Sequence, residues 1–208
     1  MTIGRLHVIT DVSIQSRFSH DELAEMACQG GAQVIQLRDK SLSDETFLDV
    51  AQRVASICRG YEVTFIVNDR VEIAREVGAG VHLGQRDATI ADARASLGPS
   101  AVIGMSAGTV ESASAVEEAG AAYIGFGHIF PTTSKQKESL AVGVELLAAV
   151  AHDAHIPVIA IGGITETNAA RVMASGAWGI AVIGAVCSAD DPRAATQRLR
   201  AIVDRFAD

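Results

Sequence analysis

The 208-residue chain has few cysteines and few aromatic residues, and it has no long hydrophobic run. Cys28, Cys58 and Cys187 lie far apart, so we expect neither a disulfide framework nor a zinc site, and a reducing cytoplasm fits best. The most apolar segment, residues 156–164, is much too short to cross a bilayer, and the N-terminal residues lack the apolar stretch of a signal peptide. The sequence therefore predicts a cytoplasmic protein without a membrane partner.

Positive charge is also scarce. Lysine and arginine total 17 against 25 acidic residues, which gives a net charge of −8. Nucleic-acid-binding proteins usually carry a basic stripe, so we expect no nucleic-acid partner, whereas a small anionic substrate needs only a local group of cations. Hydrophobic residues make up 49% of the chain, enough for a large core, and the length suits one domain spanning residues 1–208.

Short apolar segments alternate with longer Ala-rich segments along the whole chain. Strands are expected at 6–10, 34–38, 63–68, 81–83, 101–106, 123–127, 157–161 and 179–183, and helices near 21–29, 44–58, 71–77, 89–97, 110–119, 144–152, 166–175 and 192–206. Strands that are apolar at every position indicate a parallel sheet covered on both faces. Eight strand–helix units predict a single (β/α)8 barrel, because a doubly wound open sheet rarely takes eight units in so few residues.

Several residues are typical of helix boundaries. Ser43, Thr109 and Thr165 each precede an acidic first turn and are expected to cap a helix N-terminus. Glycines are expected to end four helices, at positions 30–31, 78, 120 and 176.

Active sites of such barrels lie at the carboxyl ends of the strands, so polar residues at those ends are the site candidates. The ends of the second, third and fourth strands and the residues just after them supply Gln36, Arg38, Lys40, Asn68, Asp69 and Asp87. Two carboxylates beside cations suit Mg²⁺, which binds through a few carboxylates and substrate phosphate oxygens. The alternative is that Asp69 and Asp87 simply cap the helices that follow.

The remaining strand ends suit phosphate. Ser106 ends the fifth strand, and Ile183 ends the eighth. The sixth strand is followed by His128, Thr132, Thr133, Ser134 and Lys135, and the last two strands are followed by Gly163 and Gly184. Hydroxyls, a lysine and glycine-exposed N–H groups bind phosphate, and His128 could act as a general acid or base. The strand ends thus suit two binding sites, one for a metal-bound pyrophosphate and one for a monophosphate. An enzyme that joins a phosphorylated acceptor to a pyrophosphate-activated donor would need both.

The sequence closely resembles the thiamine phosphate synthase and TenI thiazole tautomerase superfamily from about Leu6 to Leu199. The motifs that carry the resemblance are residues 36–40 (Gln-Leu-Arg-Asp-Lys), 67–70 (Val-Asn-Asp-Arg), 81–87 (Val-His-Leu-Gly-Gln-Arg-Asp), 130–135 (Phe-Pro-Thr-Thr-Ser-Lys) and 160–164 (Ala-Ile-Gly-Gly-Ile). The resemblance implies condensation of hydroxymethylpyrimidine pyrophosphate with hydroxyethylthiazole phosphate, which gives thiamine phosphate and pyrophosphate.

The resemblance also implies roles for individual residues. The pyrimidine pyrophosphate would bind Gln36, Arg38, Lys40, Asn68, Ser106 and Lys135; the thiazole phosphate would bind Thr132, Thr133, Ser134, Gly163, Ile183 and Gly184; and Mg²⁺ would bind Asp69 and Asp87. Lys135, Ser106 and His128 are the catalytic candidates, and a homodimer is expected by likeness alone. TenI has a proton-transferring histidine where His128 stands, so a metal-free tautomerase is the alternative, with a non-catalytic thiamine-phosphate-binding regulator as a third.

Overall fold

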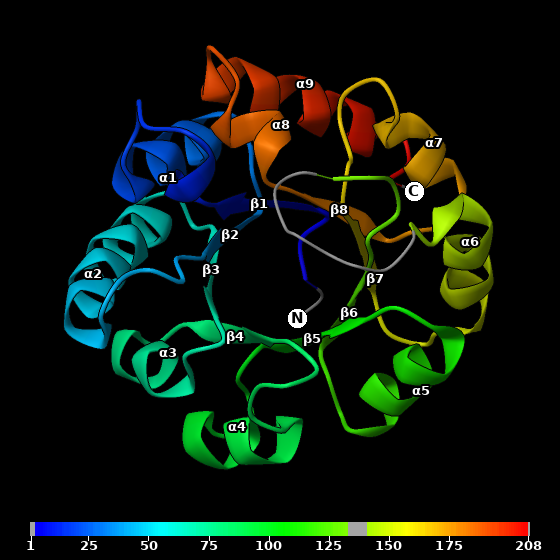
Figure 1. Ribbon diagram of the computed structural model, residues 1–208, viewed down its shortest axis with the longest axis horizontal. Helices are drawn as coiled ribbons and strands as arrows, with labels where there is room; N and C mark the ends of the chain where they lie inside the picture. The colour runs from blue at the N-terminus through cyan, green and yellow to red at the C-terminus, as the bar shows by residue number, and fades with distance from the viewer. Residues whose placement is uncertain (1–2, 133–140, 208) are drawn as a thin grey trace.

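Eight parallel strands close into a barrel in which each strand pairs with its sequence neighbours and β8 pairs with β1 (Figure 1). The computed structural model describes residues 3–132 and 141–207. The strands are β1 (Leu6–Thr10), β2 (Val34–Leu37), β3 (Thr64–Asn68), β4 (Gly80–Leu83), β5 (Ile103–Ala107), β6 (Tyr123–Gly127), β7 (Val158–Ile161) and β8 (Gly179–Val182). The predicted (β/α)8 barrel is therefore confirmed.

Helices form a ring around the barrel (Figure 1). They are α1 (His20–Gln29), α2 (Asp44–Gly60), α3 (Val71–Val77), α4 (Ile90–Leu97), α5 (Val110–Glu118), α6 (Gly143–Asp153), α7 (Ala169–Ala174) and α9 (Pro192–Asp204). Two short elements were not predicted: a 3-10 turn, η1 (Val12–Ile14), after β1, and α8 (Gly184–Cys187), which follows β8 directly.

Two of the three predicted helix N-caps are confirmed. Ser43 accepts a hydrogen bond from the Thr46 N–H, and Thr109 forms a capping box with Ser112, as predicted. The prediction for Thr165 is wrong, because α7 begins only at Ala169. The Thr165 N–H donates to the Asn168 side chain at 2.9 Å, which closes a turn where the helix was expected to begin.

The barrel encloses one hydrophobic core and is wrapped by another. The inner core includes Ile9, Val34, Ile66, Tyr123, Ile159, Ala181 and Ile183, which project from the strands into the barrel. The larger outer core packs the opposite faces of the strands against the helices, which explains why the strands are apolar at nearly every position. Among the described segments, no helix has both the length and the apolar character needed to cross a membrane.

Candidate active site

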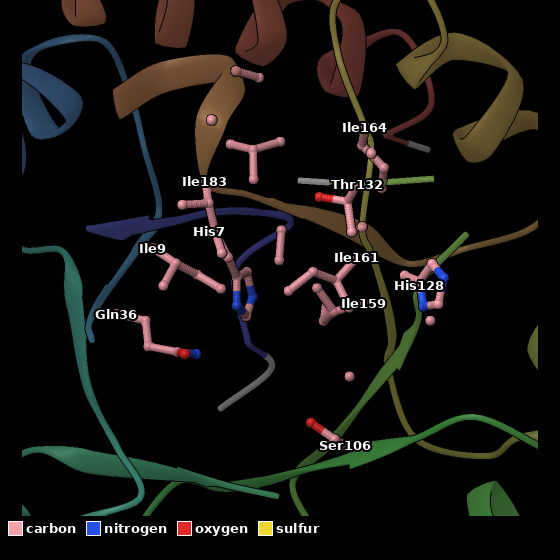
Figure 2. A pocket seen from close by; sticks show the side chains of 18 of the residues that line it. His7, Ile9, Gln36, Ser106, His128, Thr132, Ile159, Ile161, Ile164 and Ile183 are labelled. Atoms are coloured by element: carbon pink, nitrogen blue, oxygen red, sulfur yellow. The ribbon is translucent and has the colours of Figure 1, made fainter. Parts of the chain in front are cut away.

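A cavity of about 440 Å³ lies inside the barrel and reaches the loops that follow β6, β7 and β8. Seven predicted site residues line it: Gln36, Ser106, His128, Thr132, Gly163, Ile183 and Gly184. Figure 2 shows the polar ends of Gln36 and Ser106 turned inward, with isoleucines on the opposite wall. An apolar wall with a few inward polar groups is the usual environment for a small organic ring.

Two acidic side chains meet at the ends of β3 and β4. Burial raises the pKa of the Asp69 carboxyl, and the neighbouring Asp87 carboxyl, to which it hydrogen-bonds, raises it further. The ammonium group of Lys40 lies 3.5 Å from Asp69 Oδ2. A bound divalent cation would relieve the repulsion between the two carboxylates, so the pair fits Mg²⁺ held by few protein ligands. No group of three or more candidate metal ligands occurs within the described part of the chain.

Helix capping does not explain these two carboxylates. Asp69 precedes Arg70, which occupies the N-cap of α3 without a side-chain cap, and Thr89 caps α4 instead of Asp87. Asp87 Oδ2 accepts from the Gly84 N–H at 2.6 Å and so stabilises its own turn. Asp69 has a left-handed backbone, with φ of 65°, which is unfavourable for a non-glycine residue and concentrates at functional sites.

The polar residues at the end of β2 and just after it point to different places. Gln36 is buried in the cavity, whereas the Arg38 guanidinium pairs with the buried Asp11 carboxylate. Arg38, Lys40, Asn68, Asp69 and Asp87 do not line the cavity itself. Arg38 is thus held at the barrel mouth by an ion pair that its position in the sequence did not indicate.

His82 joins the carboxylate pair to the cavity. Its carbonyl accepts from the Asp69 N–H at 2.9 Å, and its ring lines the cavity and hydrogen-bonds to Ser106 Oγ at 2.9 Å. The Gln85 amide donates to the Ser106 carbonyl at 2.5 Å. These bonds connect β3, β4 and β5 at the side of the mouth where the two carboxylates lie.

A buried anchor fixes the turn between β2 and α2. The His20 ring bridges Thr10 Oγ1 at 2.8 Å and Asp39 Oδ2 at 3.1 Å. Burial alone would raise the pKa of the Asp39 carboxyl, but hydrogen bonds from Ser41, His20 and Leu42 outweigh it and lower the pKa from 3.8 to about 2. This turn places Lys40 beside Asp69, one of the two candidate metal ligands.

The lowered pKa of Asp39 predicts how acid affects stability. A carboxyl with a depressed folded-state pKa contributes stability above its unfolded pKa of 3.8 and loses it as the pH falls through about 2. We expect Asp39→Asn to reduce the difference in the free energy of unfolding between pH 5 and pH 2, measured by urea denaturation. The same acid sensitivity in variant and wild type would contradict this assignment.

The loops after β6 and β7 pack closely together. Gly163 has φ of 65°, and a Cβ there would lie 2.5 Å from the Pro131 carbonyl oxygen and 2.8 Å from Phe130 Cβ. The Phe130 N–H donates to the Gly162 carbonyl at 3.0 Å. The positive φ and the close packing thus require glycine at position 163, independently of any contact with phosphate. Thr133, Ser134 and Lys135, the other predicted phosphate ligands, lie outside the described residues.

Three cavity residues received no role from the sequence. His7 is almost fully buried, its Nε2 lies 2.9 Å from the Gly4 carbonyl, and burial lowers its pKa to about 4. Tyr123 and His82 also line the cavity and hydrogen-bond to each other. A polar residue inside an otherwise apolar barrel strand was the available signal, since alternate positions of each strand face the interior. His20, His152 and His155 lie outside the cavity lining.

Known proteins match both the sequence and the fold. A family model described as thiamine monophosphate synthase matches residues 6–186. The chain is 45% identical to a thiamine-phosphate synthase of Salinibacter ruber, covering 98% of this chain and 90% of the relative, and 46% identical to one of Methanocella arvoryzae, covering 97% and 95%. The solved thiamine phosphate pyrophosphorylase of Pyrococcus furiosus superposes with a TM-score of 0.90 at 38% identity, covering 98% of this chain and 97% of that one.

Proposed function

The chain belongs to the thiamine monophosphate synthase family, and from this premise we propose that it joins hydroxymethylpyrimidine pyrophosphate to hydroxyethylthiazole phosphate, giving thiamine phosphate and pyrophosphate. The enzyme is then a transferase acting on two small phosphorylated substrates. We place the reaction in the cytoplasm, where the three buried free cysteines stay reduced. The relatives that match over nearly the whole chain are named as synthases, so the tautomerase alternative is not favoured.

One observation supports this function most directly: an apolar cavity with inward polar groups adjoins a pair of carboxylates that face each other. The cavity suits the two uncharged rings, and the carboxylate pair suits the metal that accompanies a pyrophosphate. His82 connects the two, because its ring lines the cavity while its carbonyl binds the Asp69 N–H. The ring and its leaving group can therefore occupy neighbouring positions.

Each group has a definite task in this reaction. Gln36 and Ser106 would orient the pyrimidine, and Thr132, Gly163, Ile183 and Gly184 line the part of the cavity assigned to the thiazole phosphate. When bound by Asp69 and Asp87, Mg²⁺ would neutralise charge on the departing pyrophosphate. The carbon–oxygen bond to the pyrophosphate breaks with its electron pair going to oxygen, and the thiazole nitrogen bonds to the pyrimidine methylene carbon. The isoleucine walls exclude water that would otherwise capture this carbon.

A coupling assay tests the proposal. We expect the purified protein to form thiamine phosphate and pyrophosphate from the two substrates with Mg²⁺, and a chelator to abolish product formation until Mg²⁺ is added back in excess. Failure to form thiamine phosphate would contradict the synthase function. In that case, isomerisation of a thiazole carboxylate phosphate would identify a tautomerase, and tight calorimetric binding of thiamine phosphate without turnover would identify a regulator.

A further inference from the structure

Three side chains from neighbouring strands form a continuous hydrogen-bonded chain at the cavity. Tyr123 on β6 hydrogen-bonds through its hydroxyl to His82 Nδ1 on β4 at 3.0 Å, and His82 Nε2 hydrogen-bonds to Ser106 Oγ on β5 at 2.9 Å. The Tyr123 and His82 rings stack with centroids 5.6 Å apart. The chain begins in the buried interior at Tyr123 and ends at Ser106, whose side chain points into the cavity (Figure 2).

The neighbouring strands leave space for these two rings. A Cβ on Gly104 would lie 2.1 Å from Tyr123 Cζ, and a Cβ on Gly125 would lie 2.7 Å from His82 Cε1. The His7 ring packs edge-on against Tyr123 with centroids 5.3 Å apart. Both rings are thus confined by packing, so the hydrogen-bonded chain is held in a defined geometry.

The two ring nitrogens of His82 join the hydroxyls of Tyr123 and Ser106. Burial raises the pKa of Tyr123, so its hydroxyl stays protonated, and His82 is its hydrogen-bond partner among the described residues. Because each hydroxyl is held by a different nitrogen of the same ring, a change at Tyr123 alters how that ring holds Ser106 Oγ.

We propose that Tyr123 and His82 are positioning residues that fix the Ser106 side chain at the cavity, where its hydroxyl can hydrogen-bond to a polar ring. This inference rests on the proposed function, in which the pyrimidine substrate occupies this part of the cavity. Neither residue needs to touch the reacting atoms, because both act through Ser106.

A double-mutant cycle of Tyr123→Phe and Ser106→Ala tests the inference. We expect Tyr123→Phe alone to raise the KM for the pyrimidine pyrophosphate about tenfold, the cost of a misdirected hydrogen bond, without changing the KM for the thiazole phosphate. In the Ser106→Ala background, the same substitution should change the KM by less than twofold, because its effect passes through the missing hydroxyl. Tyr61→Phe, at the exposed second tyrosine of the chain, is the matched control and should leave both KM values unchanged.

Equal effects of Tyr123→Phe in both backgrounds, or a parallel rise in both KM values, would overturn the inference. Should Tyr123→Phe fail to fold, His82→Gln and His82→Leu take its place in the cycle. Glutamine can still accept and donate, so it should retain more affinity for the pyrimidine pyrophosphate than leucine does. A wild-type protein that makes no thiamine phosphate would refute the proposed function and this inference together, whereas additive effects in an active wild type would refute this inference alone.

Discussion

We expect Asp69→Asn to lower the rate of thiamine phosphate formation by about 100- to 1000-fold, since a metal ion stabilises transition-state charge by several kcal/mol. The substitution removes one of the two adjoining carboxylates at the ends of β3 and β4. The carboxylate that remains binds a divalent cation only weakly on its own. It preserves the size of the side chain, so the left-handed turn at this position should persist. Asparagine also tolerates that conformation better than most residues.

The measurement is the initial rate as a function of Mg²⁺ concentration. Higher Mg²⁺ should restore part of the activity of Asp69→Asn, because one carboxylate remains. Asp190→Asn is the matched control, since that carboxylate is exposed and pairs with Arg17 at 3.2 Å. Equal activity and an unchanged Mg²⁺ dependence in Asp69→Asn would remove the carboxylate pair from the proposed mechanism.

A second large effect is expected at Gly163. Gly163→Ala combines an unfavourable left-handed backbone with a Cβ pressed against the Pro131 carbonyl and Phe130. We expect it to lower the free energy of unfolding by about 3 kcal/mol, from backbone strain and overpacking together. The loops after β6 and β7 would separate, so the affinity for the thiazole phosphate should fall as well.

Gly78→Ala isolates the steric part of that effect. Gly78 has nearly the same backbone, with φ of 68° against 65°, but a Cβ there would meet no atom within 4 Å. We expect it to cost only about 1 kcal/mol, the price of the left-handed conformation. Urea denaturation of both variants measures the difference, and equal losses would show that the packing of the two loops contributes little.

The barrel was predictable from the sequence because its cause is local and repeated. Strands that are apolar at nearly every position, such as Val34–Leu37, indicate burial on both faces, and the regular alternation with helices indicates the topology. The bounds of helices with clear caps, such as Ser43 before α2, were also predictable. The prediction of a helix start at Thr165 was wrong because the Asn168 side chain accepts a hydrogen bond from the Thr165 N–H and closes a turn there.

The candidate site was predictable in outline but not in its connections. Residues at strand ends, such as Gln36 and Gly163, line the cavity because parallel strands of a barrel end at one rim. The pairing of Arg38 with Asp11 depends on side-chain conformations across two strands, which no spacing along the chain reveals. The hydrogen-bonded chain through Tyr123 depends on the register of β4, β5 and β6, which only the folded barrel defines.

The closed circle of strands has a further consequence for how two reactants meet. Asp69 and Asp87 follow β3 and β4, whereas Gly163 and Gly184 follow β7 and β8, on the other side of the same ring (Figure 1). Each strand between them is hydrogen-bonded to both neighbouring strands. The circumference of the barrel therefore sets the distance between the two groups of strand ends. Changes in the connecting loops can therefore alter which molecules bind, while the spacing of the strand ends beneath them stays fixed.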